Sequence, residues 1–216
     1  MILVYPLKSQ NDYTELRYSL RSLRFLSHIS EVIVIGSQLP DWLTGVTWIN
    51  VPDVPGRKQF SIKNKIIAAL EYTKKEVLFM NDDVYLLYPQ NRFPFYFLGD
   101  LKKVGESGSQ PLMKQLIKMG KSTKNFDGHY PLIYGTGFKK IVERFSDDTI
   151  IKSLYCNYLG IEGVEIPDNK LVKEFKHGVI ESFIRDKPSF STGVNSLQSA
   201  LHVLQELFPK PSKYEI

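Results

Sequence analysis

The sequence predicts an α/β fold in which a mixed, mainly parallel sheet is flanked by helices. Continuous apolar runs of strand length, such as residues 77–80, are typical of strands buried on both faces of a parallel sheet. These runs alternate with segments of helical periodicity in the order β-α-β-β-α-β, which favours right-handed crossovers. The 216 residues are 43% hydrophobic and 24% charged, so we expect a single domain with a sizeable core.

The first half of the chain supplies the predicted strands and the helices between them. The strands are expected at residues 2–5, 31–36, 46–51 and 77–80. A helix is expected over residues 14–26, because Leu16, Leu20 and Leu23 recur at helical spacing. A second helix is expected over residues 60–72, where apolar residues recur at the same spacing.

Both predicted helices carry basic residues. Arg17, Arg21 and Arg24 share one flank of the first helix, where they form either a solvated face or contacts to phosphate. Lys63 and Lys65 lie in the first turns of the second helix, where cations oppose the helix dipole. An anion shared with the helix N-terminus would explain that placement.

The strand at residues 77–80 runs directly into Asn81-Asp82-Asp83. Ligands of open α/β sheets gather at the carboxyl ends of the strands. Two adjacent carboxylates beside a core are costly unless positive charge neutralises them, and a divalent metal that carries phosphates is a common partner. A turn with solvated side chains is the alternative interpretation.

Composition and charge narrow the function classes. The net charge of +5 and the pI of about 9.1 suit phosphate-bearing substrates, but the basic residues are spread along the chain and do not require a nucleic-acid module. No apolar run approaches a membrane span, and we expect no signal peptide. The single cysteine, Cys156, excludes an internal disulfide, is expected to be a surface thiol and fits a cytoplasmic location.

The second half of the chain breaks the strand–helix rhythm. Residues 92–97 are strongly aromatic, and a basic helix is expected over residues 112–119. This helical and aromatic segment is either an insertion or lid that binds an acceptor, or ordinary structure packed on the sheet. Further expected elements are a helix at 135–145, a strand at 164–167, a strand or helix at 177–183, a turn at 190–193 and a C-terminal helix at 196–208.

Three segments together resemble the Stealth family. They are ELRYSLRSL at residues 15–23, QLPDWL at 38–43 and FMNDD at 79–83, in the family's order and at similar separations. Stealth proteins are sugar-phosphate transferases of capsule synthesis whose core is related to GT-A nucleotide-sugar glycosyltransferases. The resemblance covers roughly residues 13–88, and it implies a GT-A-like, Rossmann-like fold. It also implies a nucleotide-sugar-binding half over residues 1–88 and an acceptor-side half over 89–216.

Two departures from the family pattern shift the expected activity. The family's opening Trp-Val-Asn-Gly block is here Tyr5-Pro6-Leu7-Lys8-Ser9, and the chain is much shorter than typical members. A compact glycosyltransferase that uses a nucleotide sugar therefore fits better than a sugar-phosphate transferase, which remains an alternative. Residues 190–193 and 208–215 resemble small bacteriophage-type glycosyltransferases, which implies a glycan or a hydroxylated base of phage DNA as the acceptor.

The resemblance also implies roles for individual residues. Asn81-Asp82-Asp83 stands where GT-A enzymes have their DxD motif, so Asp83 would bind Mn²⁺ or Mg²⁺ on the donor diphosphate and Asp82 would lie beside the ribose or sugar. His129 would be a further metal ligand or a general base, and Asp127 competes for the base role.

The donor is expected to be a UDP-sugar. The loop from Lys8 to Asp12 would hold its nucleotide base, and Lys63 with Arg17 or Arg21 would hold its diphosphate. A third function class stays open as well. A non-enzymatic nucleic-acid-binding protein would use the aromatic segment and the lysines of the basic helix, namely Lys114, Lys118 and nearby Lys121.

Overall fold

A five-stranded sheet forms the centre of the protein. The computed structural model describes residues 1–8, 12–104, 109–175, 178–193 and 195–216. The sheet has the strand order β3-β2-β1-β4-β7. Its strands are β1 (Ile2–Pro6), β2 (Glu31–Gly36), β3 (Thr47–Asn50), β4 (Val77–Phe79) and β7 (Leu132–Tyr134). Only β7 pairs antiparallel, with β4, so the predicted mixed, mainly parallel sheet is confirmed.

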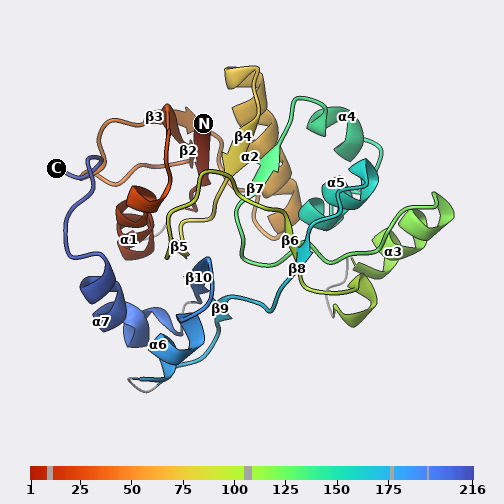
Figure 1. Ribbon diagram of the computed structural model, residues 1–216. Helices are drawn as coiled ribbons and strands as arrows, with labels where there is room; N and C mark the ends of the chain where they lie inside the picture. The colour runs from red at the N-terminus through yellow and green to blue at the C-terminus, as the bar shows by residue number, and fades with distance from the viewer. Residues whose placement is uncertain (9–11, 105–108, 176–177, 194) are drawn as a thin grey trace.

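Each face of the sheet is covered by a helix, as Figure 1 shows. Val4 packs with Ile66 of α2 (Lys58–Thr73) in one apolar cluster. Leu3 packs with Leu16 of α1 (Thr14–Ser22) in a second cluster on the other face. None of these four side chains is exposed. Burial on both faces explains why the strands are continuous apolar runs.

A smaller sheet adjoins the central one and is built mainly from the end of the chain. Its order is β5-β10-β9, with β5 (Val84–Leu86), β10 (Ser189–Thr192) and β9 (Lys170–Leu171). The helices α6 (Val179–Ile184) and α7 (Leu197–Leu207) pack on this sheet in a third apolar cluster. Because β5 follows the turn after β4, this pairing brings residues near 170 and 190 back to Asn81-Asp82-Asp83.

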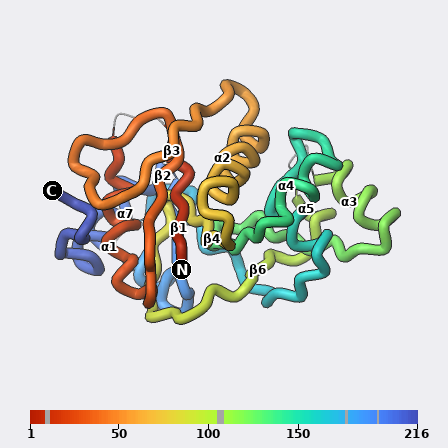
Figure 2. The backbone as a smooth tube through the Cα atoms, turned by 90° about the horizontal axis from the view of Figure 1, so that it is seen from above, coloured from red at the N-terminus to blue at the C-terminus, as the bar shows by residue number. Residues whose placement is uncertain are grey.

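The middle segment belongs to the body of the protein. Figure 2 shows α3 (Ser109–Lys118), α4 (Phe138–Val142) and α5 (Ile151–Leu159) beyond α2, at the end away from α1 and α7. Leu112 and Leu116 of α3 are buried in the same cluster as α2. The strands β6 (Tyr96–Phe97) and β8 (Val164–Glu165) pair with each other. Two 3-10 turns, Leu23–Phe25 and Leu101–Lys103, complete the described elements. The segment is therefore packed structure.

Several sequence predictions were wrong or missing. The expected turn at 190–193 is strand β10, because its ladder to β5 satisfies the backbone and Phe190 is fully buried. The strand β7 and the helix α5 were not predicted, and the helix expected at 135–145 is the shorter α4. Cys156 lies inside α5 with no exposure, and burial raises the pKa of its thiol, so it is no surface thiol.

The segment expected as a strand or helix at 177–183 is helical over its described residues, which belong to α6 and its N-terminal cap, Gly178. Residue 177 lies outside the described ranges. In the part of the chain that the structure describes, no helix combines the length and apolar character of a membrane span.

The buried hydroxyl of Ser19 links three elements by hydrogen bonds beneath the Asn81-Asp82-Asp83 turn. Ser19 Oγ of α1 donates to the carbonyl oxygen of Val84 in β5 at 2.5 Å. The Tyr5 hydroxyl of β1 lies 3.0 Å from the same Ser19 oxygen, and because that oxygen has only one hydrogen, Tyr5 is the donor there. All three residues are at most 1% exposed, so water cannot replace these bonds.

We predict that Ser19→Ala lowers the free energy of unfolding by about 1–3 kcal/mol, because it leaves two buried polar groups without partners. Urea denaturation measures the change. Ser22→Ala is the matched control, since Ser22 is equally buried but donates only to the Ser19 carbonyl one turn earlier in the same helix. Equal losses of unfolding free energy in the two variants would contradict the proposed role of the Ser19 hydrogen bonds.

Candidate functional site

A cleft of about 790 Å³ opens where the parallel strands end. Its walls come from the segments that follow β1 to β4 and from the start of α2. The lining residues that carry polar or charged groups are Lys8, Ser37, Asp53, Lys58, Ser61, Lys65 and Asn81. This edge of the sheet is the one at which α/β proteins hold ligands.

The cleft is rich in positive charge. Lys65 is buried, donates to the Leu7 carbonyl at 2.9 Å and pairs with Asp53 at 2.8 Å. Lys8 and Lys58 are exposed in its wall. The helix α2 begins at Lys58, so the partial positive charge of its N-terminus adds to that of the lysines. The cleft therefore suits an anionic ligand.

Acidic side chains gather beside the cleft, next to Asn81. Burial, together with the charges of Asp83 and Glu15, raises the pKa of Asp82 to about 7, while Lys65 acts in the opposite direction. Burial also raises the pKa of Glu15, although a hydrogen bond from Thr192 at 2.8 Å opposes it. These carboxylates are close enough to repel one another.

Lys170 of β9 reaches into this acidic cluster. Its Nζ lies 3.3 Å from Asp83 Oδ2 and 3.2 Å from His129 Nε2. An ammonium group can only donate, so His129 Nε2 accepts and the ring proton is on Nδ1. That Nδ1 faces Asp168 Oδ1 at 3.6 Å. The four side chains lie in a row in which each faces the next, in the order Asp83, Lys170, His129 and Asp168.

The second acidic candidate, Asp127, has its own partner. Ser153 of α5 donates to its carboxylate. Lys152, also in α5, donates to the carbonyl oxygens of Gly128 and Tyr130 at 3.0 and 2.9 Å. Burial lowers the pKa of Lys152, against the opposing charges of Asp127 and Asp83. Helix α5 thus holds the backbone on both sides of His129.

The predicted metal ligands do not form a metal site. In the described parts of the chain, no three or more His, Cys, Asp or Glu side chains are grouped so that they could hold an ion. The Lys170 ammonium lies between Asp83 and His129 and donates to His129 Nε2, and because the ring proton is on Nδ1, neither ring nitrogen has a lone pair left for a metal ion. The donor set of Asp82, Asp83 and His129 therefore does not fit Mn²⁺ or Mg²⁺.

The residues predicted to hold the diphosphate have other partners. Arg17 and Arg21 both pair with Glu215, at 3.0 and 2.7 Å, and Arg17 also stacks on Trp42. Lys63 pairs with Asp147. The sequence could not reveal this, because the acidic partners lie far along the chain. Their contacts thus lend no support to a role in diphosphate binding.

The predicted nucleotide loop is described only at its ends. Lys8 lines the cleft. Asp12 accepts from the backbone N–H and the hydroxyl of Thr14, at 2.9 and 2.6 Å, at the start of α1. Residues 9–11 lie outside the described ranges. Sequence reasoning missed Asp53, Asp168 and Lys170, which no recognised motif marks.

Comparison with solved structures supports the fold. The chain is similar to the crystal structure of an active-site mutant of LgtC, with a TM-score of 0.50 and 12% identity over 96% of this chain and 95% of that one. The galactosyltransferase LgtC in complex with donor and acceptor sugar analogs gives 0.49 and 13%, over 99% and 97%. The apo-form glycosyltransferase GlyE of Streptococcus pneumoniae TIGR4 gives 0.45 and 13%, over 99% and 65%.

No family model and no curated protein matches the chain, so the Stealth resemblance gains no support there. At this level of identity the likeness shows the fold, and it confirms the predicted GT-A-like α/β class.

The pairing of Glu215 with α1 leads to a test of stability. Its side chain is only 3% exposed. Burial acts to raise the pKa of Glu215, but hydrogen bonds from Arg21 and Ser212 outweigh burial and hold the pKa below its ordinary value. A lowered pKa in the folded state means stabilisation that is present above the ordinary value and lost as the pH falls through the lowered one.

We predict that Glu215→Gln lowers the unfolding free energy by about 2 kcal/mol at neutral pH, and that this difference from the wild type shrinks below about pH 4. Denaturation curves across this pH range measure both effects. Glu206→Gln, at an exposed glutamate of α7, is the control and leaves stability unchanged. A Glu215→Gln effect that persists undiminished in acid would rule out the charge as its cause.

Proposed function

We propose that the protein is a glycosyltransferase that transfers a sugar from a nucleotide-activated donor, a UDP-sugar, to an acceptor hydroxyl. The observation that carries this proposal is the basic cleft at the carboxyl ends of β1 to β4, which meets the acidic cluster at Asn81-Asp82-Asp83. A nucleotide sugar has a matching polarity, since its diphosphate is anionic and its ribose and sugar hydroxyls are donors for carboxylates. The fold, shared with LgtC, is compatible with this assignment.

The cleft residues suggest how the donor binds. Lys8, Lys58 and the N-terminus of α2 attract its phosphates. Asp53, which Lys65 holds in place, accepts from ribose hydroxyls. Asp82 lies beside the ribose or sugar. Asp83 Oδ1 is buried with no hydrogen-bond partner among the described residues, so it can accept from a sugar hydroxyl.

In the reaction, the bond from the anomeric carbon to the diphosphate oxygen breaks, and the electron pair leaves with the nucleoside diphosphate. The acceptor oxygen forms the new bond to the anomeric carbon and gives its proton to a base. Asp127 is our candidate for that base, because the other predicted base, His129, accepts from Lys170 at Nε2 and carries its ring proton on Nδ1. The acceptor is a glycan or a hydroxylated base of DNA, the latter in keeping with a bacteriophage source.

The nearest alternative is transfer of a sugar phosphate. That reaction releases a nucleoside monophosphate, whereas sugar transfer releases a diphosphate. Chromatography of the nucleotide product separates the two. The nucleic-acid-binding alternative uses the exposed lysines of α3, Lys114 and Lys118, and requires DNA or RNA binding that weakens steeply with salt.

We predict that UDP stabilises the protein, by about 2.7 kcal/mol at a free concentration about 100 times its Kd. The double variant Lys8→Glu, Lys58→Glu reverses two charges in the cleft and weakens UDP binding by about tenfold or more. Calorimetric titration measures the affinity, and Lys118→Glu on the exposed face of α3 is the matched control, with affinity unchanged. If none of UDP, CDP, GDP and ADP binds, the proposed function is wrong.

A further inference from the structure

We propose that Lys170 takes the place of a divalent metal ion at this site, so that donor binding and departure of the diphosphate do not need a metal. The inference rests on the proposed function and identifies the group that stabilises the diphosphate. The observation behind it is positional, since the Lys170 ammonium lies between the two side chains predicted to share a metal, Asp83 and His129.

The distances leave no room for both cations. Mn²⁺ or Mg²⁺ requires oxygen or nitrogen ligands at about 2.0–2.2 Å. An ammonium 3.3 Å from Asp83 Oδ2 and 3.2 Å from His129 Nε2 fills that space with its own hydrogens. It also carries charge of the same sign, so it would repel the metal. The side chains of Asp83 and Lys170 are only 15% and 23% exposed, which limits screening by water.

The ammonium has one hydrogen left for a ligand. It carries three N–H donors, and two of them serve Asp83 and His129. The described residues offer no third acceptor. A phosphate oxygen of the donor can accept this bond, and charge-assisted bonds of this kind are about twice as strong as neutral ones.

The small sheet holds Lys170 in this position. In its ladders Lys170 lies opposite Ser191, and Ser191 lies opposite Val84, the residue after Asp83. The neighbouring Asn169 donates to the His129 carbonyl at 3.0 Å and to Ser189 Oγ at 3.1 Å. The strands of the small sheet therefore fix Lys170 relative to both of its partners, Asp83 and His129. A cation held in place before the reaction stabilises developing charge without reorganisation.

The chemistry balances without a metal. As the bond between the anomeric carbon and the diphosphate oxygen breaks, the electron pair moves onto the diphosphate. The third N–H of Lys170 donates to that oxygen or to its neighbour, and the ammonium keeps its proton. No further co-reactant is required.

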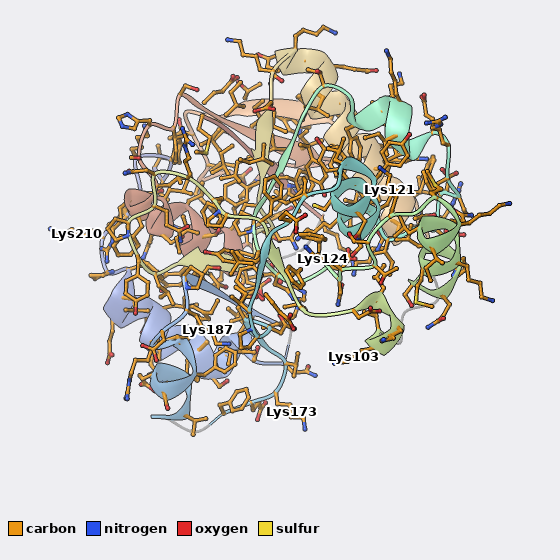
Figure 3. The ribbon with its side chains drawn as sticks, turned by 45° about the vertical axis from the view of Figure 1, so that its right-hand side comes forward. Lys103, Lys121, Lys124, Lys173, Lys187 and Lys210 are labelled. Atoms are coloured by element: carbon orange, nitrogen blue, oxygen red, sulfur yellow. The ribbon has the colours of Figure 1, made fainter. Side chains whose placement is uncertain are left out.

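The test compares UDP binding by calorimetry in excess EDTA and in excess MnCl₂, with the whole protein. We expect the two affinities to agree within about twofold, and electron paramagnetic resonance to detect no Mn²⁺ bound to the wild-type protein. We expect Lys170→Met to weaken UDP binding about tenfold or more in EDTA, and Lys170→Arg, which keeps the charge, to retain most of it. Lys173→Met is the control, because Lys173 is exposed at the edge of the molecule, as Figure 3 shows.

Two outcomes would overturn the inference and leave the proposed function intact. One is UDP binding by the wild-type protein only when Mn²⁺ is present. The other is UDP binding by folded Lys170→Met that equals the wild type in EDTA. If Lys170→Met does not fold, the wild-type comparison and Lys170→Arg still decide. Absence of binding by any nucleoside diphosphate in both buffers would overturn the proposed function and this inference together.

Discussion

Negative charge at the edge of a buried sheet is the constraint on which this structure depends. Glu15, Asp82 and Asp83 meet where the central strands end, and burial raises the pKa of both Glu15 and Asp82. Carboxylates in such a place must be protonated or balanced by cations. The protein supplies Lys65 from α2 on the side of the cleft and Lys170 from β9 on the other side. The carboxylates outnumber these lysines, and we propose that the excess serves to accept from hydroxyl groups of the donor.

Supplying those cations requires both halves of the chain. The first half builds the sheet and the carboxylates, but Lys170 and His129 come from the second half. They reach the cluster because β10 pairs with β5 and with β9, and because Thr192 donates from its backbone to the Asp83 carbonyl at 3.2 Å. The halves are also joined by the ion pair between Glu215, in the second half, and Arg21 of α1, in the first. Strand pairing thus joins the two halves that were predicted on either side of residue 88.

Local signals account for what the sequence predicted. The strands and helices before residue 88 have apolar patterns that repeat within a few residues, and Asn81-Asp82-Asp83 is adjacent to its strand. Long-range partners account for what was missed. Arg17 and Arg21 look like free cations until Glu215 is placed beside them. β10 was missed because its serines and threonine resemble a turn, although all four of its residues are buried. Lys170 has no signal, because its partners lie about 40 and 90 residues away.

The positions of the basic residues distinguish side chains that are paired within the protein from side chains that are available to bind a ligand. Arg17, Arg21 and Lys63 are each paired with a carboxylate outside the cleft, so their charge is already balanced. Lys8 and Lys58 line the cleft with no ion pair among the described residues. Lys170 has an ion pair but also an unused donor. The unpaired lysines of the cleft and the unused donor of Lys170 are therefore the positive groups on which our proposal for an anionic donor rests.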